Sequence, residues 1–131
     1  MDKSYEILST NSNYAVIGMT DDQKKFSYRI YTLLKNKGKI TRGIHHRLTE
    51  VEGERIYNSI EAIEDPIDVA VFVVNPTIGI NYLEPIKAKG ISTIWLQPGT
   101  VSDELVAKAN DLGLNVVEDC VLATYARNES K

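Results

Sequence analysis

The sequence has 131 residues, of which 43% are apolar and 25% are charged, and its formal net charge at pH 7 is −3. This length and composition predict one globular domain large enough to bury a core, and the negative balance excludes a broad electrostatic surface for nucleic acid. The single cysteine, Cys120, excludes an internal disulfide and favours a reducing compartment.

Signals for membrane insertion or secretion are missing from the sequence. No apolar run approaches the roughly 18 residues of a membrane-spanning helix. Residues 1–13 are polar and include Asp2 and Glu6, a pattern unlike that of a secretory signal peptide. We therefore predict a cytoplasmic protein with no membrane partner.

The first third of the chain predicts two helices and two strands. Apolar positions within residues 5–8 indicate a short helix, and the nearly continuous apolar run at residues 14–18 predicts a central strand covered on both faces. An apolar stripe near the helical period predicts a helix from about residue 26, which Gly38 ends as a C-terminal cap. Residues 40–44 predict a weaker strand.

The middle of the chain contains the strongest strand signal. Residues 51–57 predict a short excursion and residues 59–63 a short helical turn, and residues 68–74 then form the most apolar strand of the sequence. Pro85 would clash in a helix interior. The helix after this strand is therefore expected to be regular only over residues 81–89.

The last third alternates strand and helix again. Residues 91–96 predict a strand, and Ser102 is the expected N-cap of a helix over residues 103–112, whose acidic first turn suits the helix dipole. Residues 114–117 predict the last strand and residues 121–126 a short terminal helix.

Strands that alternate with helices of these lengths predict crossover connections and a parallel sheet. We expect one Rossmann-like α/β domain over residues 1–131, with a doubly wound, mainly parallel sheet of about five strands in a three-layer α/β/α arrangement. In such sheets a ligand binds beyond the carboxyl ends of the strands, near the point where the strand order reverses.

The strongest candidate for a ligand site is the turn between the central strand and the second helix. Residues 18–20 end the apolar run at a glycine, and backbone N–H groups of such a turn and of the next helix, together with the helix dipole, favour an anion. The cations available at this corner are Lys24, Lys25 and Arg29. The glycine can equally serve only as a tight turn, and Ser27 only as an N-cap.

Two common nucleotide motifs are absent from this turn. The dinucleotide fingerprint requires three glycines in the spacing G-x-G-x-x-G, whereas the second and third positions here are Thr20 and Gln23. It also requires an acid near the end of the second strand, where this chain carries His45 and His46. NAD is therefore disfavoured, and the absence of Gly-Lys-Ser/Thr excludes a P-loop.

The two adjacent histidines do not predict a metal site. Neighbouring residues of an extended segment point to opposite sides, and no cysteine or acidic cluster accompanies His45 and His46. We expect no bound metal, and we interpret the pair either as a neutral histidine near a base or as part of a surface loop.

Several segments together resemble a known family. They are Ala15 to Thr20, Ser27-Tyr28-Arg29, Leu34 to Gly38, Gly53-Glu54, Trp95 to Gly99, and Gly113 to Cys120. On these segments the chain from Tyr14 to Ala126 is similar to the single-domain coenzyme A-binding proteins. Their Rossmann-like fold is shared with the N-terminal part of the succinyl-CoA synthetase alpha subunit. The most specific part is Trp95-Leu96-Gln97 together with Glu118-Asp119-Cys120.

This resemblance implies coenzyme A (CoA) as the ligand. It implies that the phosphates lie near the glycine turn and that the ends of neighbouring strands flank the adenine and ribose. Nearby basic residues would supply the positive charge that the 3′-phosphate and pyrophosphate require. The residues expected to contact CoA are Gly18, Met19, Thr20, Lys24, Lys25, Ser27, Tyr28, Arg29, Ile44, His45, Val74, Asn75, Pro76 and Gln97.

Three functions are compatible with these features. The first is binding of CoA or a short acyl-CoA without catalysis, because no catalytic constellation is readable in the sequence. The second is thiol-linked CoA or acyl chemistry at Cys120, which aligns with a cysteine of the family. The third is an interaction or regulatory module that kept the fold and lost the ligand.

The third function depends on departures from the family pattern. Relatives usually carry Pro-Val-Asn-Pro at residues 43–46, an arginine in place of Asn75, and a proline within residues 22–25. The expected partner remains a small molecule and not nucleic acid, and a homodimer is compatible with the sequence although no segment predicts it.

Overall fold

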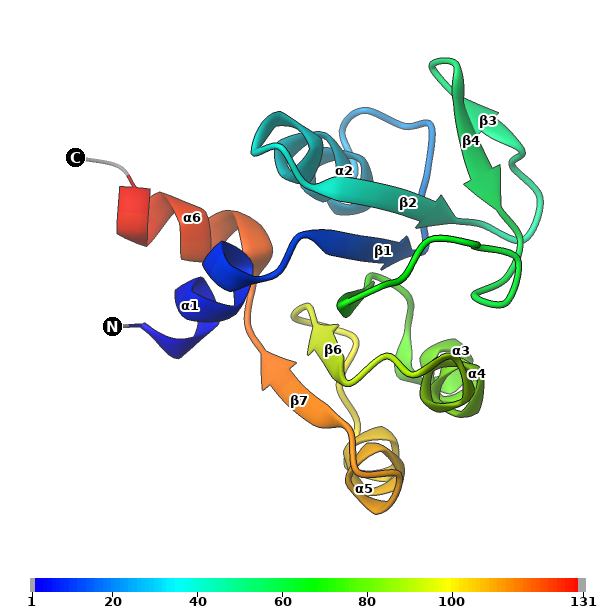
Figure 1. The fold of residues 1–131 in the computed structure, drawn as a ribbon, viewed down its shortest axis with the longest axis vertical. Helices are drawn as coiled ribbons and strands as arrows, with labels where there is room; N and C mark the ends of the chain where they lie inside the picture. Colours follow the sequence, from blue (N-terminus) through cyan, green and yellow to red (C-terminus); the bar gives the residue numbers. More distant parts are fainter. Residues whose placement is uncertain (1, 130–131) are drawn as a thin grey trace.

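Helices and strands alternate along the chain, and the computed structural model describes residues 2–129. Helices cover both faces of one sheet (Figure 1). Within residues 2–129, no helix is long and apolar enough to cross a membrane. The elements in chain order are α1 (Lys3–Thr10), β1 (Asn13–Ile17), α2 (Phe26–Asn36), β2 (Ile40–Ile44), β3 (Glu50–Val51), β4 (Glu54–Tyr57), β5 (Val69–Phe72), α3 (Pro76–Gly79), the 3₁₀ turn η1 (Ile80–Tyr82), α4 (Leu83–Lys89), β6 (Thr93–Leu96), α5 (Asp103–Asp111), β7 (Asn115–Glu118) and α6 (Val121–Glu129).

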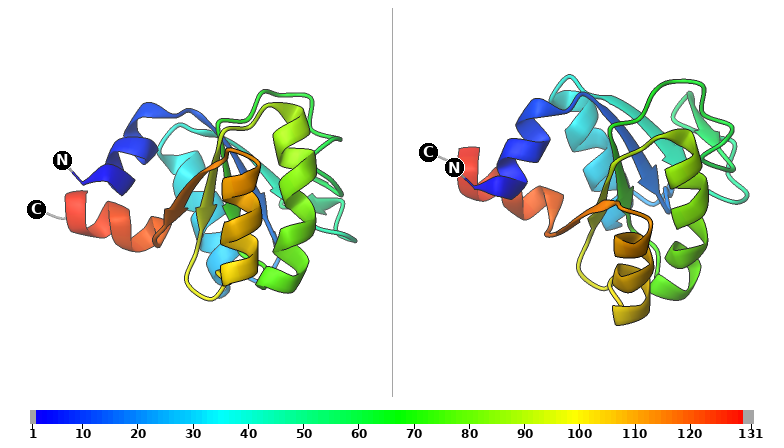
Figure 2. Two further views of the ribbon diagram at one scale, coloured as in Figure 1. Left: turned by 90° about the horizontal axis from the view of Figure 1, so that it is seen from below. Right: turned by 60° about the horizontal axis from the view of Figure 1, so that its bottom comes forward.

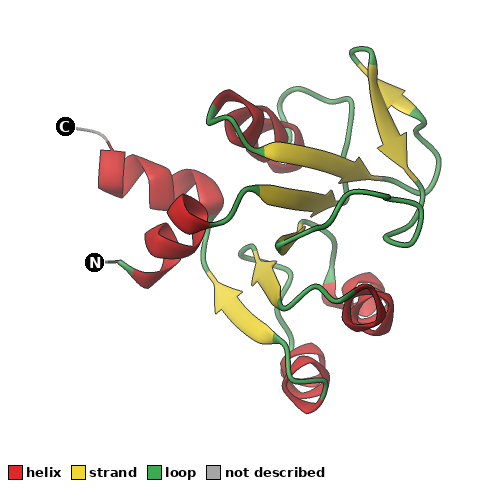
Figure 3. Cartoon of the chain, in the orientation of Figure 1, coloured by secondary structure: helices red, strands yellow, loops and turns green. Residues whose placement is uncertain are grey.

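The sheet has the strand order β3-β4-β2-β1-β5-β6-β7, and its neighbouring strands are parallel except in the β3–β4 hairpin. The chain winds outward from β1 in both directions, so the strand order reverses between β1 and β5. Ile17 pairs with Ile44 and with Phe72, which brings the carboxyl ends of β1, β2 and β5 together; the ends of β1 and β2 are visible in Figure 3. The predicted doubly wound α/β fold is confirmed.

Within residues 2–129 the sheet contains seven strands, which is more than the expected five or so. The difference lies in residues 50–57, which form a hairpin around Glu52 and Gly53, at φ values of 51° and 83°. Its second strand, β4, then pairs in parallel with β2. A glycine in a two-residue turn is a hairpin signal, but β3 is too short for its alternation to be recognised.

Alternation along the strands divides the core between the two faces of the sheet. β1 contributes Ala15 and Ile17 to one buried cluster and Tyr14 and Val16 to the other. Helices α4 and α5 cover the first cluster and lie side by side in Figure 2, whereas α1, α2 and α6 cover the second. Each aliphatic side chain buried in this way stabilises the fold by about 1.5–3 kcal/mol.

The segment between β5 and β6 is helical earlier than the sequence indicates. The Asn75 side chain accepts a hydrogen bond from the Ile78 N–H at 3.0 Å and caps a helical path that begins at Pro76. This path passes through η1 before α4 begins at Leu83. Pro85 therefore lies in the first turn of α4, where the expected clash is avoided.

Other predicted bounds also differ from the structure. The strands predicted over residues 14–18, 91–96 and 114–117 cover residues 13–17, 93–96 and 115–118. β5 ends at Phe72. The Val73 N–H still donates to the Ile17 carbonyl at 2.9 Å, and the pairing stops there because the neighbouring strand β1 ends at Ile17. Residues 59–63 form a turn without a helix. α6 continues beyond residue 126 to Glu129.

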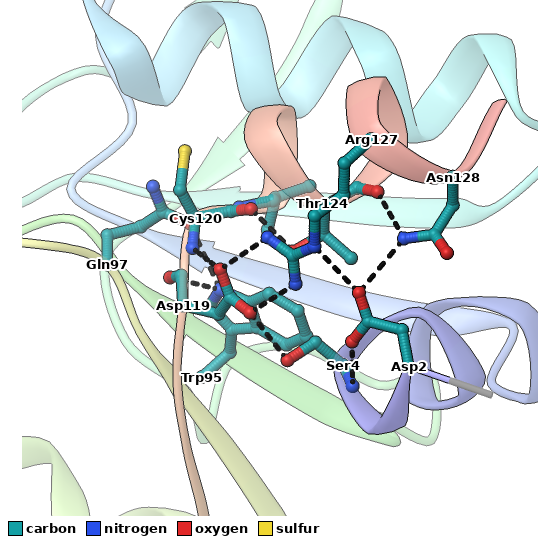
Figure 4. A network of polar contacts seen from close by, with 10 residues as sticks. Asp2, Ser4, Trp95, Gln97, Asp119, Cys120, Thr124, Arg127 and Asn128 are labelled. Atoms are coloured by element: carbon teal, nitrogen blue, oxygen red, sulfur yellow. Dashed lines mark hydrogen bonds and ion pairs between the residues drawn. The ribbon is translucent and has the colours of Figure 1, made fainter. Parts of the chain in front are cut away.

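A polar network joins the N-terminal and C-terminal helices (Figure 4). The Arg127 guanidinium donates to Asp2 Oδ2 at 2.7 Å and to the two oxygens of Asp119 at 3.2 and 2.6 Å. The Ser4 hydroxyl also donates to Asp119 Oδ2 at 2.7 Å. These bonds, above all those from Arg127, lower the pKa of Asp119 to about 2. The network therefore fixes the start of α1 against the last turn of α6 and against Asp119, which precedes that helix.

Candidate functional site

A cavity of about 710 Å³ lies at the carboxyl ends of β1, β2 and β5, where the strand order reverses. Its volume falls in the range of small-molecule and cofactor sites. The residues that line it are Gly18, Met19, Thr20, Lys25, Phe26, Ser27, Ile44, His45, His46, Val73, Val74, Ile78 and Tyr82. The cavity is thus at the position that the fold class favours for a ligand.

Gly18 allows the turn after β1 to pass very close to the end of β5. Its φ is +99°, and a Cβ atom there would lie 2.8 Å from both the Val73 carbonyl oxygen and Val74 Cγ1. The N–H groups of Gly18 and Met19 both donate to the Ile44 carbonyl, at 3.0 and 2.8 Å. These two donors therefore hold the turn to β2 and are not free for an anion, in contrast to the expectation from the sequence.

The loop over residues 20–25 is organised by its own polar groups. The Asp22 N–H donates to Thr20 Oγ1 at 3.1 Å, and Asp22 Oδ1 accepts the Lys24 N–H at 3.0 Å. The Asp22 carbonyl accepts the Lys25 N–H at 3.1 Å. This arrangement brings Lys25 to the cavity and leaves Lys24 exposed outside its lining.

The start of α2 supplies unpaired donors to the cavity. The N-cap residue is Lys25, whose side chain makes no capping hydrogen bond, so Ser27 is not the N-cap that the sequence allowed. Ser27 is only 3% exposed and lines the cavity, and its hydroxyl has no partner among the described residues. First-turn N–H groups of an uncapped helix also lack intrahelical partners. These groups together suit an anion.

Glu52, at the tip of the β3–β4 hairpin, contacts the loop over residues 20–25 and α2 from outside the cavity. Glu52 Oε2 accepts hydrogen bonds from the Tyr28 hydroxyl at 2.5 Å and from Gln23 Nε2 at 3.1 Å. The bond to Glu52 raises the pKa of Tyr28. Glu52 therefore links the loop over residues 20–25 to α2, and Tyr28 is engaged away from the cavity.

His45 presents a defined tautomer at the end of β2. Its Nδ1 accepts the N–H groups of Arg47 and Leu48, at 3.0 and 2.9 Å. Partial burial, followed by the nearby charges of His46 and Arg47, lowers the pKa of His45. The ring is therefore neutral at pH 7, with its proton on Nε2.

The two histidines stack, which differs from the opposite orientations expected for an extended segment. Their ring centroids are 4.5 Å apart with an interplanar angle of 23°, because the chain bends at residues 46–47 directly after the strand. Both rings line the cavity. Among residues 2–129, no group of three or more histidine, cysteine or acidic residues is arranged to hold a metal ion.

Apolar side chains from the end of β5 and from α2, α3 and η1 line the cavity, and we call this set the apolar rim. It consists of Phe26, Val73, Val74, Ile78 and Tyr82. Only Val74 was predicted from the sequence. An apolar residue just beyond a ligand-facing strand end is a signal that could have found Val73. Phe26, Ile78 and Tyr82 lie on α2, α3 and η1, and the position of a strand end does not mark them.

The structure brings some predicted contact residues together and separates others. The predicted residues that line the cavity are Gly18, Met19, Thr20, Lys25, Ser27, Ile44, His45 and Val74. The predicted residues outside the lining are Lys24, Tyr28, Arg29, Asn75, Pro76 and Gln97. Among these, the Arg29 guanidinium lies 5.5 Å from the centre of the Phe26 ring, at the edge of the cavity.

Two residues with the most specific sequence signal have structural contacts. Gln97 is buried, and its Oε1 accepts Trp95 Nε1 at 3.0 Å and the Val121 N–H at 2.8 Å. Cys120 is partly buried beside Asp119, which accepts the Cys120 N–H at 2.7 Å (Figure 4). Neither residue lines the cavity.

Comparisons with known proteins agree with this architecture. A family model described as a CoA binding domain matches residues 12–126. The uncharacterized protein YneT of Bacillus subtilis is 25% identical over 126 residues, covering 92% of this chain and 90% of that protein. A solved structure of a hypothetical protein from Pyrococcus horikoshii OT3 is 26% identical, with a TM-score of 0.90 over 97% of this chain and 91% of the other.

A larger protein contains the same fold as one part. The dinucleotide-forming acetyl-coenzyme A synthetase 1 of Ca. Korarchaeum cryptofilum, solved in its apo form, is 21% identical with a TM-score of 0.68. The match covers 81% of this chain and 26% of that chain. At this identity the likeness concerns the fold alone.

Proposed function

Because the chain belongs to the CoA binding domain family, we propose that it binds coenzyme A in the cavity at the carboxyl ends of β1, β2 and β5. One observation supports this site above the others. The cavity joins an uncapped helix start, the unpartnered hydroxyl of the buried residue Ser27, and the cation of Lys25. These are the groups that bind a phosphate.

The proposed pose assigns the phosphates of CoA to the polar part of the cavity. Lys25 and Ser27 would contact the pyrophosphate directly, and Thr20 lies on the same lining. Lys24 and Arg29 lie outside the lining and would act on the exposed 3′-phosphate through their charge. Gly18 contributes by permitting the close turn, since its own N–H is bonded to Ile44.

The adenine and ribose are assigned to the ends of β2 and β5. Ile44, His45 and Val74 line this part of the cavity. His45 is neutral and carries its proton on Nε2, so it would donate to an acceptor of the base or ribose and not form an ion pair with phosphate.

Thermal unfolding with a panel of ligands tests the proposal. CoA, dephospho-CoA, ATP and NAD are each added in excess to the protein. A ligand at about 100 times its dissociation constant stabilises the native state by about 2.7 kcal/mol, which raises Tm by roughly 5–10 °C for a chain of this size. We expect the largest shift with CoA, a smaller shift with dephospho-CoA, and none with NAD.

Two variants locate the anion. Lys25→Ala and Ser27→Ala should each reduce the CoA-dependent shift, because each removes a group that lines the cavity. Lys87→Ala is the matched control, since Lys87 is an exposed lysine in the last turn of α4. The absence of a shift with every ligand, or equal losses in Lys25→Ala and Lys87→Ala, would contradict the proposal.

A further inference from the structure

The apolar rim exposes side chains that the packing of the core does not use. Phe26 is 57% exposed and Ile78 is 48% exposed, which makes them the two most exposed of the large apolar side chains identified on the described surface. They lie at the start of the two helices that flank the cavity, α2 and α3. The buried face of α2 is complete without Phe26, because Ile30, Tyr31 and Leu34 form its contact with the core.

Single exposed apolar residues are ordinary, but these two line one cavity together with Tyr82 and the valines that follow β5. Exposed apolar residues gathered at one cavity favour a binding surface. The polar groups lie at Lys25, Ser27 and the two histidines of the same cavity. The cavity therefore combines groups suited to an anion with side chains suited to a hydrocarbon.

This combination restricts the chemistry of the ligand. In CoA the pyrophosphate joins the adenosine 3′-phosphate to the pantetheine arm, whose apolar groups are two methyl groups and short methylene links between polar groups. A CoA thioester with an aliphatic acyl group adds a continuous hydrocarbon chain beyond the end of that arm. We infer that the ligand of this protein is an aliphatic acyl-CoA of several carbons, and that Phe26, Ile78 and Tyr82 bind its acyl group. The inference rests on the proposed function.

Affinity should therefore rise with the length of the acyl chain. Full burial of a methylene is worth about 0.8 kcal/mol, which corresponds to a roughly fourfold tighter Kd. Because the rim is open to solvent, we expect roughly a two- to fourfold gain per methylene from acetyl to butanoyl and hexanoyl.

Titration calorimetry with CoA, acetyl-CoA, butanoyl-CoA and hexanoyl-CoA tests this inference on the full chain. Ile78→Ser and Phe26→Ser remove hydrocarbon from the rim without changing charge, and both sites are exposed, so both variants should fold. Ile40→Ser is the matched control: Ile40 is 43% exposed at the start of β2, the opposite end of that strand from the cavity. The chain-length gain should shrink to less than twofold per methylene in the two rim variants and persist in Ile40→Ser.

The possible results separate the inference from the proposed function. CoA that binds with the same Kd as hexanoyl-CoA would overturn the acyl site and leave CoA binding intact. No binding of CoA or of any thioester would overturn both. Concentration-dependent dimerisation in analytical ultracentrifugation that Ile78→Ser abolishes and hexanoyl-CoA does not affect would show that a second copy covers the rim, and would also overturn the inference.

Discussion

Replacing Gly18 by alanine should destabilise the protein by about 2–5 kcal/mol. The backbone is at φ +99°, and left-handed backbone costs a residue with a side chain on the order of 1–2 kcal/mol. The added Cβ would also lie 2.8 Å from the Val73 carbonyl oxygen and 2.8 Å from Val74 Cγ1. Overpacking of this kind costs about 1–3 kcal/mol, and relief would require the turn to move away from the end of β5.

Two other glycines separate the cost of the left-handed backbone from the cost of overpacking. Gly38 has φ +82°, and a Cβ added there would have no atom within 4 Å, so Gly38→Ala should show the backbone cost alone, about 1–2 kcal/mol. Gly43 has no left-handed φ, but its Cβ would meet Met19 Cγ at 2.7 Å. Gly43→Ala should therefore show overpacking alone, about 1–3 kcal/mol.

The assay is urea unfolding at pH 7, followed by the fluorescence of Trp95, which is the single tryptophan and is fully buried. The three variants should retain the m-value of the parent protein and differ in midpoint. A Gly18→Ala variant that loses no more stability than Gly38→Ala would refute the reasoning, because the close approach to Val73 and Val74 would then carry no cost.

Three further predictions follow from the polar contacts. Arg127 lowers the pKa of Asp119 from 3.8 to about 2, so it contributes stability that is present above about pH 4 and lost as the pH falls toward 2. In urea unfolding, Arg127→Met should lose less unfolding free energy between pH 5 and pH 3 than the parent protein does, and an equal loss would contradict this. The lowered pKa of His45 means that protonation favours the unfolded chain, so the free energy of unfolding should decline as the pH falls below 6.5. In His45→Asn, which keeps an acceptor for the turn, this free energy should decline less between pH 7.5 and 5.5. Equal slopes in the two proteins would count against the prediction. Gln97→Met should cost about 1–3 kcal/mol of unfolding free energy because the buried Val121 N–H loses its acceptor, whereas Trp95 Nε1 keeps the Asp119 carbonyl at 2.8 Å; the Kd for CoA should stay the same. Weaker binding without a loss of stability would instead favour the ligand contact predicted from the sequence.

The elements that the sequence predicts well are those with a complete local signal. The apolar run that becomes β1 and the Ser102 cap of α5 each depend on neighbouring residues, and both occur in the structure as expected. The hairpin of β3 and β4 was not recognised because β3 has only two residues and because β4 also pairs with β2, a contact between segments that are not neighbours in sequence. The same reason applies to the polar network of Arg127 with Asp2, which joins the two ends of the chain.

The sequence by itself determined the fold class and the corner of the sheet at which a ligand is expected, because periodicity and glycine spacing are local properties. Only the tertiary structure decided which side chains share the cavity. It separated Gln97 from the cavity and brought Phe26 and Ile78 together, although these two residues belong to different helices far apart along the chain. It also showed that the N–H groups of Gly18 and Met19 are bonded to Ile44. The availability of a donor depends on what the rest of the fold brings to it, and no local pattern records that.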